Sequence, residues 1–94
     1  MFTQHEAFRR HACYYLKLAE EADRYLSGAD QETWLEELET SYDNLQAALL
    51  WLIEHQPDDD SGLRLAIALS CFWDTRGYFT EGRLQIERAI TAYR

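Results

Sequence analysis

Helix breakers are scarce in this chain: its 94 residues include one proline, Pro57, and glycines only at positions 28, 62, 77 and 82. Between these positions, apolar residues recur at intervals of three and four, which is the repeat of one face of an α-helix. No segment alternates apolar and polar residues as a half-buried strand does. The sequence therefore predicts an all-α fold with a few long helices.

The first half of the chain predicts two of these helices. Thr3 and Glu6 have the spacing of a capping box at the start of the first helix, and Gly28 is placed to end it in the left-handed conformation. Asp30 is placed to cap the second helix, which ends just before the proline. We expect these two helices to form a first hairpin over about 3–56.

The second half predicts another pair. Asp60 or Ser61 caps the third helix, Gly77 stops it, and Thr80 caps the fourth helix. This second hairpin covers about 61–93. Because the connections are short, we expect four antiparallel helices in a single domain that spans residues 1–94.

The charge is unevenly distributed, and its pattern excludes some partners. The net charge is −8, and residues 30–60 contain ten acidic side chains but no lysine or arginine. An acidic middle without a basic stripe argues against direct binding to nucleic acid or to an anionic membrane surface. The longest apolar run, 47–53, has seven residues and is too short to span a membrane.

The residue types that carry catalysis or bind metals are present but not grouped. His5 and His11 are six residues apart and lie on different faces of a helix. The aspartates at 58–60 lack the alternation and the closing glutamate of a calcium loop. Cys13 and Cys71 lack CxxC spacing and no secretory signal precedes them, which predicts buried free thiols in a cytoplasmic protein. We expect no enzyme activity, no metal and no cofactor.

Gly82 falls inside an otherwise good helix, where glycine costs roughly 0.5–1 kcal/mol relative to alanine. The tetratricopeptide pattern, W-x2-L-G-x2-Y, then A-x3-F, then P, explains it. With the turn glycine of that pattern on Gly77, small residues fall at Ser70, Gly82 and Ala89, where paired helices approach closely. The register assigns repeat-packing positions to eight residues: Ala66, Leu69, Ser70, Trp73, Gly77, Gly82, Ile86 and Ala89.

The wider sequence carries a family resemblance. The segments RRHACYYLKLAEEADRYLSG, ELETSYDNLQAALLWLIE and GLRLAIALSCFWDTRGYFTEGRLQIERAI resemble the tetratricopeptide-like helical-repeat region of bacterial STAND-type signalling ATPases and LuxR-like transcriptional regulators. The resemblance spans about Phe8 to Ile90. It implies a right-handed superhelical array within a larger multidomain protein. It also implies a non-catalytic sensor segment that binds a protein, a peptide or other domains of its parent chain. The chain has no GxxxxGK[ST] motif, so any ATPase domain would lie outside it.

The repeat register also predicts a partner-facing surface. In this architecture the first helix of each pair lines the concave side. The candidate partner-binding residues on that side are Arg64, Ala68, Cys71, Asp74 and Thr75. Arg64 and Asp74 have an alternative interpretation as salt bridges to neighbouring helices. Incomplete cover over Ile86, Ile90 and Tyr93 predicts self-association.

A second hypothesis is a stand-alone helical bundle that binds a small ligand between its helices. Its pocket would be lined by Tyr14, Tyr42, Trp51 and Trp73. The sequence supplies no convergent polar groups for such a ligand, and core packing is the simpler interpretation of these rings.

Overall fold

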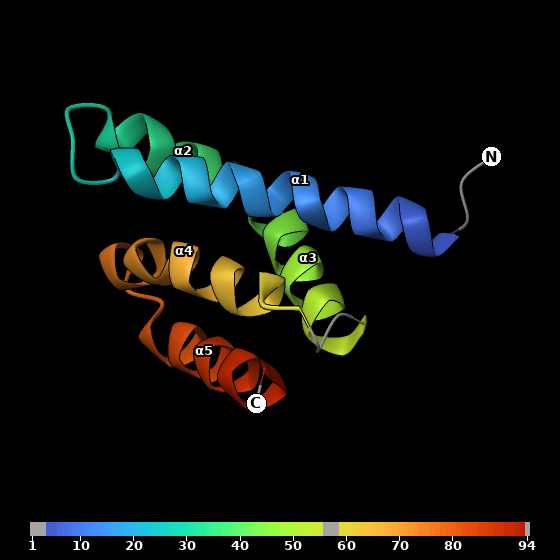
Figure 1. The fold of residues 1–94 in the computed structure, drawn as a ribbon. Helices are drawn as coiled ribbons and strands as arrows, with labels where there is room; N and C mark the ends of the chain where they lie inside the picture. Colours follow the sequence, from blue (N-terminus) through green and yellow to red (C-terminus); the bar gives the residue numbers. More distant parts are fainter. Residues whose placement is uncertain (1–3, 56–58, 94) are drawn as a thin grey trace.

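The computed structural model describes residues 4–55 and 59–93, which form five helices and no strand (Figure 1). The helices are α1 (Gln4–Tyr25), α2 (Gln31–Thr40), α3 (Tyr42–His55), α4 (Ser61–Arg76) and α5 (Phe79–Tyr93). The all-α prediction is confirmed. The prediction of four helices is wrong, because the second expected helix is divided into α2 and α3.

The division between α2 and α3 occurs at Ser41. The Ser41 amide donates to the Glu37 carbonyl at 3.1 Å, and the Ser41 carbonyl accepts from the Leu45 amide at 2.9 Å. Neither glycine nor proline stands here, so the sequence carries no strong breaker signal. The break lets α2 run back along the C-terminal half of α1, while α3 crosses α1 and also contacts α4 and α5 (Figure 1). The two segments thus pack on α1 in different directions, and this tertiary packing overrides the continuous helical pattern.

The two hairpins stack on each other. In Figure 1, α4 runs in the same direction as α1, and α5 returns antiparallel to α4. Helix α4 contacts both α1 and α3, and α5 contacts both α4 and α3. One apolar core joins all five helices, and its largest fully buried side chains are Phe72 and Trp73. Because both of these belong to α4, this helix is the central element of the fold.

The sequence only partly predicts how the two glycines at helix ends behave. Gly77 ends α4, as predicted, and it does so in the left-handed conformation, with φ 80°. Gly28 does not adopt that conformation, since Gly77 is the one described residue with positive φ; the prediction for Gly28 is wrong. The chain turns there without a residue of positive φ, and the Gly28 amide donates to the Tyr25 carbonyl at 3.2 Å.

The start of α5 also differs from the prediction. Thr80 was expected to cap this helix, but α5 begins at Phe79 and the Gly82 amide donates to the Tyr78 carbonyl at 2.9 Å. The Tyr78 amide in turn donates to the Trp73 carbonyl at 2.8 Å. The left-handed turn at Gly77 allows this bond. The bond places Tyr78 so that its carbonyl accepts the first hydrogen bond of α5.

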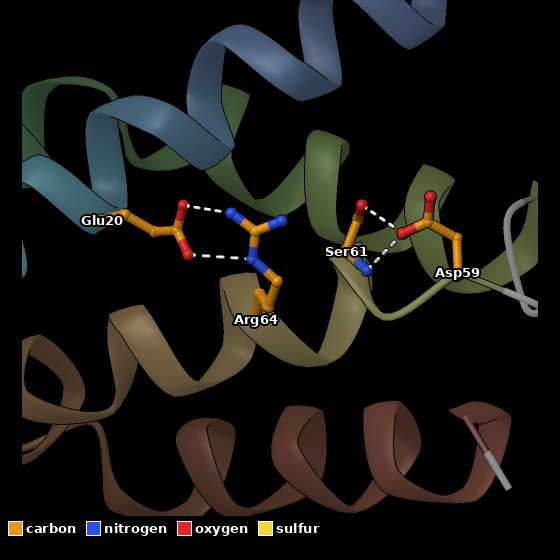
Figure 2. Close-up of polar contacts among 4 residues, drawn as sticks. All are labelled: Glu20, Asp59, Ser61 and Arg64. Atoms are coloured by element: carbon orange, nitrogen blue, oxygen red, sulfur yellow. Dashed lines mark hydrogen bonds and ion pairs between the residues drawn. The ribbon is translucent and has the colours of Figure 1, made fainter.

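The N-termini of α2 and α4 follow Asp30 and Asp60, as expected, but neither carboxylate accepts a capping hydrogen bond. At α4 the neighbouring Asp59 takes that role. Its Oδ1 accepts from the Ser61 amide at 2.7 Å and from the Ser61 hydroxyl (Figure 2). The expected capping box depends on Thr3, which lies outside the described residues.

None of the described helices combines the length and the apolar character that crossing a membrane requires.

Candidate functional site

Helices α4 and α5 approach each other closely at Gly82. A Cβ atom added to this glycine would lie 2.9 Å from the Trp73 Cβ, which is closer than real Cβ atoms come, and 3.0 Å from its Cγ. Trp73 itself is only 2% exposed. The missing side chain of Gly82 therefore lets α5 lie directly against the tryptophan.

The other repeat-packing positions surround this contact. Ala66, Leu69 and Ala89 are buried, and Ile86 packs against the core while partly exposed. The Ser70 hydroxyl donates to the Ile67 carbonyl at 2.7 Å, so its polar group is satisfied within α4. The structure thus places the small residues of the register along the α4–α5 contact.

A partly buried hydrogen-bond network joins α3, α4 and α5 beside this contact. Trp73 Nε1 donates to the Tyr42 hydroxyl at 2.7 Å, and Gln46 Nε2 donates to the same oxygen at 3.0 Å. Gln46 also donates to the carboxylate of Glu81 and accepts from Gln85 Nε2 at 3.3 Å. Burial raises the pKa of Tyr42 far above its ordinary value, and the Glu81 carboxylate raises it further. The phenol therefore stays neutral, and the network satisfies the indole N–H of the buried tryptophan.

A second polar group connects acidic α2 to the turn between α4 and α5. Arg76 lies between two glutamates, with Nη2 3.6 Å from Glu32 Oε1 and Nε 3.7 Å from Glu39 Oε1. The Tyr78 hydroxyl donates to both Glu39 oxygens, at 3.1 and 3.0 Å, and this bond raises the pKa of Tyr78. Part of the acidic charge of α2 is therefore used inside the fold. No local pattern in the sequence indicates these partners, which lie at least 37 residues apart.

Arg64 makes an ion pair with α1. Its Nε donates to Glu20 Oε2 at 3.0 Å and its Nη2 donates to Glu20 Oε1 at 2.6 Å (Figure 2). The Glu20 carboxylate raises the pKa of the guanidinium. Of the two interpretations of Arg64, the salt bridge to a neighbouring helix is the one observed.

The remaining candidate partner-binding residues lie mostly on the open face of α4. Cys71, Asp74 and Thr75 are exposed, and Cys71 Sγ lies 3.9 Å from Thr75 Oγ1. Ala68 is buried, so it supplies the base of this face rather than a projecting side chain. The two cysteines are free thiols, but the expectation that both are buried is wrong: Cys71 is exposed and Cys13 is half-buried.

Ile67 was not among the predicted residues, yet it is 57% exposed in the middle of the same face. Ile67 and Ala68 line a groove of about 440 Å³ between α1 and α4. Its walls carry charges of both signs, from Glu20, Asp23, Arg24 and Arg64. The available signal was that α4 is apolar on most of its faces, so that some apolar residue had to lie uncovered. Periodicity alone does not show which one a neighbouring helix leaves exposed.

The four rings of the small-ligand hypothesis do not converge. Tyr14 is exposed, and Tyr42 and Trp73 bond to each other in the network described above. Trp51 packs instead against His5 and His55, with ring centroids 5.2 and 5.1 Å away. Trp51 and Trp73 line different grooves.

Within residues 4–55 and 59–93, no group of three or more His, Cys, Asp or Glu side chains is placed to hold a metal ion.

No family model matches this chain, and neither the curated proteins nor the solved structures include a significant match. The arrangement of its helices and surface residues is therefore the basis for a functional proposal.

Proposed function

We propose that this chain is a non-catalytic protein-interaction segment: a tetratricopeptide-like pair of hairpins from a cytoplasmic bacterial signalling ATPase or transcriptional regulator. The observation that carries the proposal is the Gly82–Trp73 contact, together with the left-handed turn at Gly77. These residues occupy the small, large and turn positions of the repeat register. The sequence resemblance to STAND-type proteins supplies the signalling context.

The stacking of the hairpins supports the same proposal. Helix α4 lies on α1 and α3 and runs in the same direction as α1 (Figure 1). A regular repetition of this step would generate a right-handed superhelical array with the first helices of each pair on one side. In such an array α1 and α4 line the partner-facing surface.

The chemistry of that surface favours a peptide or protein partner. The α1–α4 groove combines exposed Ile67 with a rim of mixed charge that includes the Arg64–Glu20 pair. Exposed apolar area within a polar rim is typical of protein contact sites. The partner is a separate protein or peptide, or another domain of the parent chain, and no cofactor takes part.

Selection of displayed peptides on the 94-residue chain, followed by fluorescence polarisation with a selected peptide, tests this proposal. Replacing Ile67 by glutamate places a charge at the centre of the groove and is expected to weaken binding at least about tenfold. The matched control is Leu84→Glu, because Leu84 is similarly exposed but lies on α5, away from this groove.

Equal losses for Ile67→Glu and Leu84→Glu would show that the selected peptides do not use the groove. A small metabolite that raises the melting temperature with no peptide present, and equally in Ile67→Glu, would favour the small-ligand hypothesis instead.

A further inference from the structure

Helix α5 presents an apolar stripe that no described element covers. Phe79, Ile90 and Tyr93 are 63%, 42% and 50% exposed, and Ile86 is partly exposed. Their spacing of seven, four and three residues places them on one face of the helix. The stripe runs along the whole of α5, beside the face through which Gly82 and Ala89 contact the core.

The stripe borders a groove between α4 and α5. The groove has a volume of about 430 Å³, and its lining includes Trp73 and Gly82. Ser70 and Asp74 line it from α4, and Phe79 and Ile86 line it from α5. It shares no lining residue with the α1–α4 groove, although Asp74 belongs both to this groove and to the candidate partner face of α4.

One ion pair lies at the centre of the outer rim. Arg83 Nε donates to Glu87 Oε1 at 3.1 Å, and both side chains are well exposed. The midpoint between these two positions is residue 85, one residue from Ile86 at the centre of the stripe. The opposite charges are thus arranged symmetrically about the middle of an apolar surface.

We propose that this groove is a self-association surface whose occupant is α5 of a second copy, lying antiparallel to the first. A twofold axis at the level of residue 85 places Arg83 of each copy directly across from Glu87 of the other. With a rise of about 1.5 Å per residue, the two Arg83 side chains are then offset by about 6 Å along the axis. The same patch meets itself, as a twofold dimer requires. This interaction goes beyond the proposed function.

The first test is the mass of the 94-residue chain in solution. Light scattering after gel filtration is expected to show a species of about 22 kDa, twice the 11.1 kDa of one chain, at high concentration. A mass of one chain at every concentration overturns the proposal.

The second test examines the antiparallel arrangement by charge reversal. Arg83→Glu and Glu87→Arg each place like charges opposite one another, so each variant is expected to dimerise at least about tenfold more weakly. Mixing the two variants restores opposite charges at both positions. Native mass spectrometry of the mixture is therefore expected to show the mixed dimer in excess over both homodimers.

Two controls make these results specific. Leu84→Glu adds an equal charge to the other side of α5, outside the groove, and is expected to leave the dimer unchanged. Circular dichroism of each variant checks that the helices are retained. Dimers that form without preference for the mixed species, or that are lost in Leu84→Glu, place the interface elsewhere and overturn the proposal.

Discussion

The two hairpins are held together in different ways. In the first hairpin, α1 buries mainly small residues, including Ala12, Ala19 and Ala22, while α2 and α3 bury mainly leucines. In the second, α4 and α5 also contact each other extensively, but their interface includes one contact, Trp73 against the buried Gly82, that leaves no room for an added methyl group. We therefore expect the second hairpin to be most sensitive to substitutions at this contact.

The largest effect is expected for Trp73→Ala. The substitution removes the most voluminous fully buried side chain and leaves the Tyr42 hydroxyl without the indole donor. Truncation of a buried aromatic residue typically costs about 3–5 kcal/mol of unfolding free energy. Urea denaturation followed by circular dichroism measures the loss. Trp51→Ala is the control, because Trp51 is only partly buried and its loss should cost clearly less. An equal loss would show that the burial of Trp73 makes no special contribution to stability.

A smaller effect is expected for Gly82→Ala, although alanine is the better helix former. The added Cβ would meet the Trp73 Cβ at 2.9 Å, so α5 must shift. Overpacking of this kind costs about 1–3 kcal/mol, which exceeds the helix-propensity gain of roughly 0.5–1 kcal/mol. Gly28→Ala is the matched control, since its nearest contact is an ordinary 3.7 Å and its φ is not positive. A variant Gly82→Ala as stable as the parent would show that the approach of α5 to Trp73 is not tight.

The smallest effect concerns the helix starts, which also differ between the hairpins. Hydrogen bonds from Ser61 hold the pKa of Asp59 below its ordinary value of 3.8. A carboxyl whose pKa is lowered by folding stabilises the folded state above its ordinary pKa and loses that contribution as the pH falls through the lowered value.

Asp59→Asn is therefore expected to lower stability by at most about 1 kcal/mol at neutral pH and by less in acid. Denaturation at a series of pH values from about 7 down to about 2 measures how the difference declines as the carboxyl is protonated. Asp30→Asn at the start of α2 is the control, because the Asp30 carboxylate accepts no capping bond. Equal losses for both variants would show that the Asp59–Ser61 contact adds nothing special to α4.

Residues that act through backbone conformation or local spacing could be predicted from the sequence. Gly77 ends a helix because glycine tolerates positive φ, and Gly82 suggested a close approach because glycine has no side chain. The same freedom does not show when it is used, since Gly28 does not adopt positive φ. The errors at Ser41 and Thr80 are of another kind, because each is a helix boundary that depends on hydrogen bonds and packing beyond the local sequence.

The candidate partner-facing surface of α4 likewise combines residues that the sequence predicted with residues that only packing reveals. The repeat register assigned Cys71, Asp74 and Thr75 to the partner-facing side of α4, and all three are exposed. Ile67 was missed, and the partner of Arg64 was left open. The carboxylate partner of Arg64 is Glu20, which is 44 residues away in the sequence, so only the stacking of α4 on α1 brings the two together.

The sequence by itself determined that the chain is helical, where α4 stops and where two helices can touch, because these properties follow from periodicity and from glycine. The tertiary structure alone decided the break at Ser41, the network around Tyr42 and the faces of α4 and α5 that stay uncovered. Those features depend on contacts between residues far apart in the chain, and burial by a distant helix leaves no local mark in the sequence.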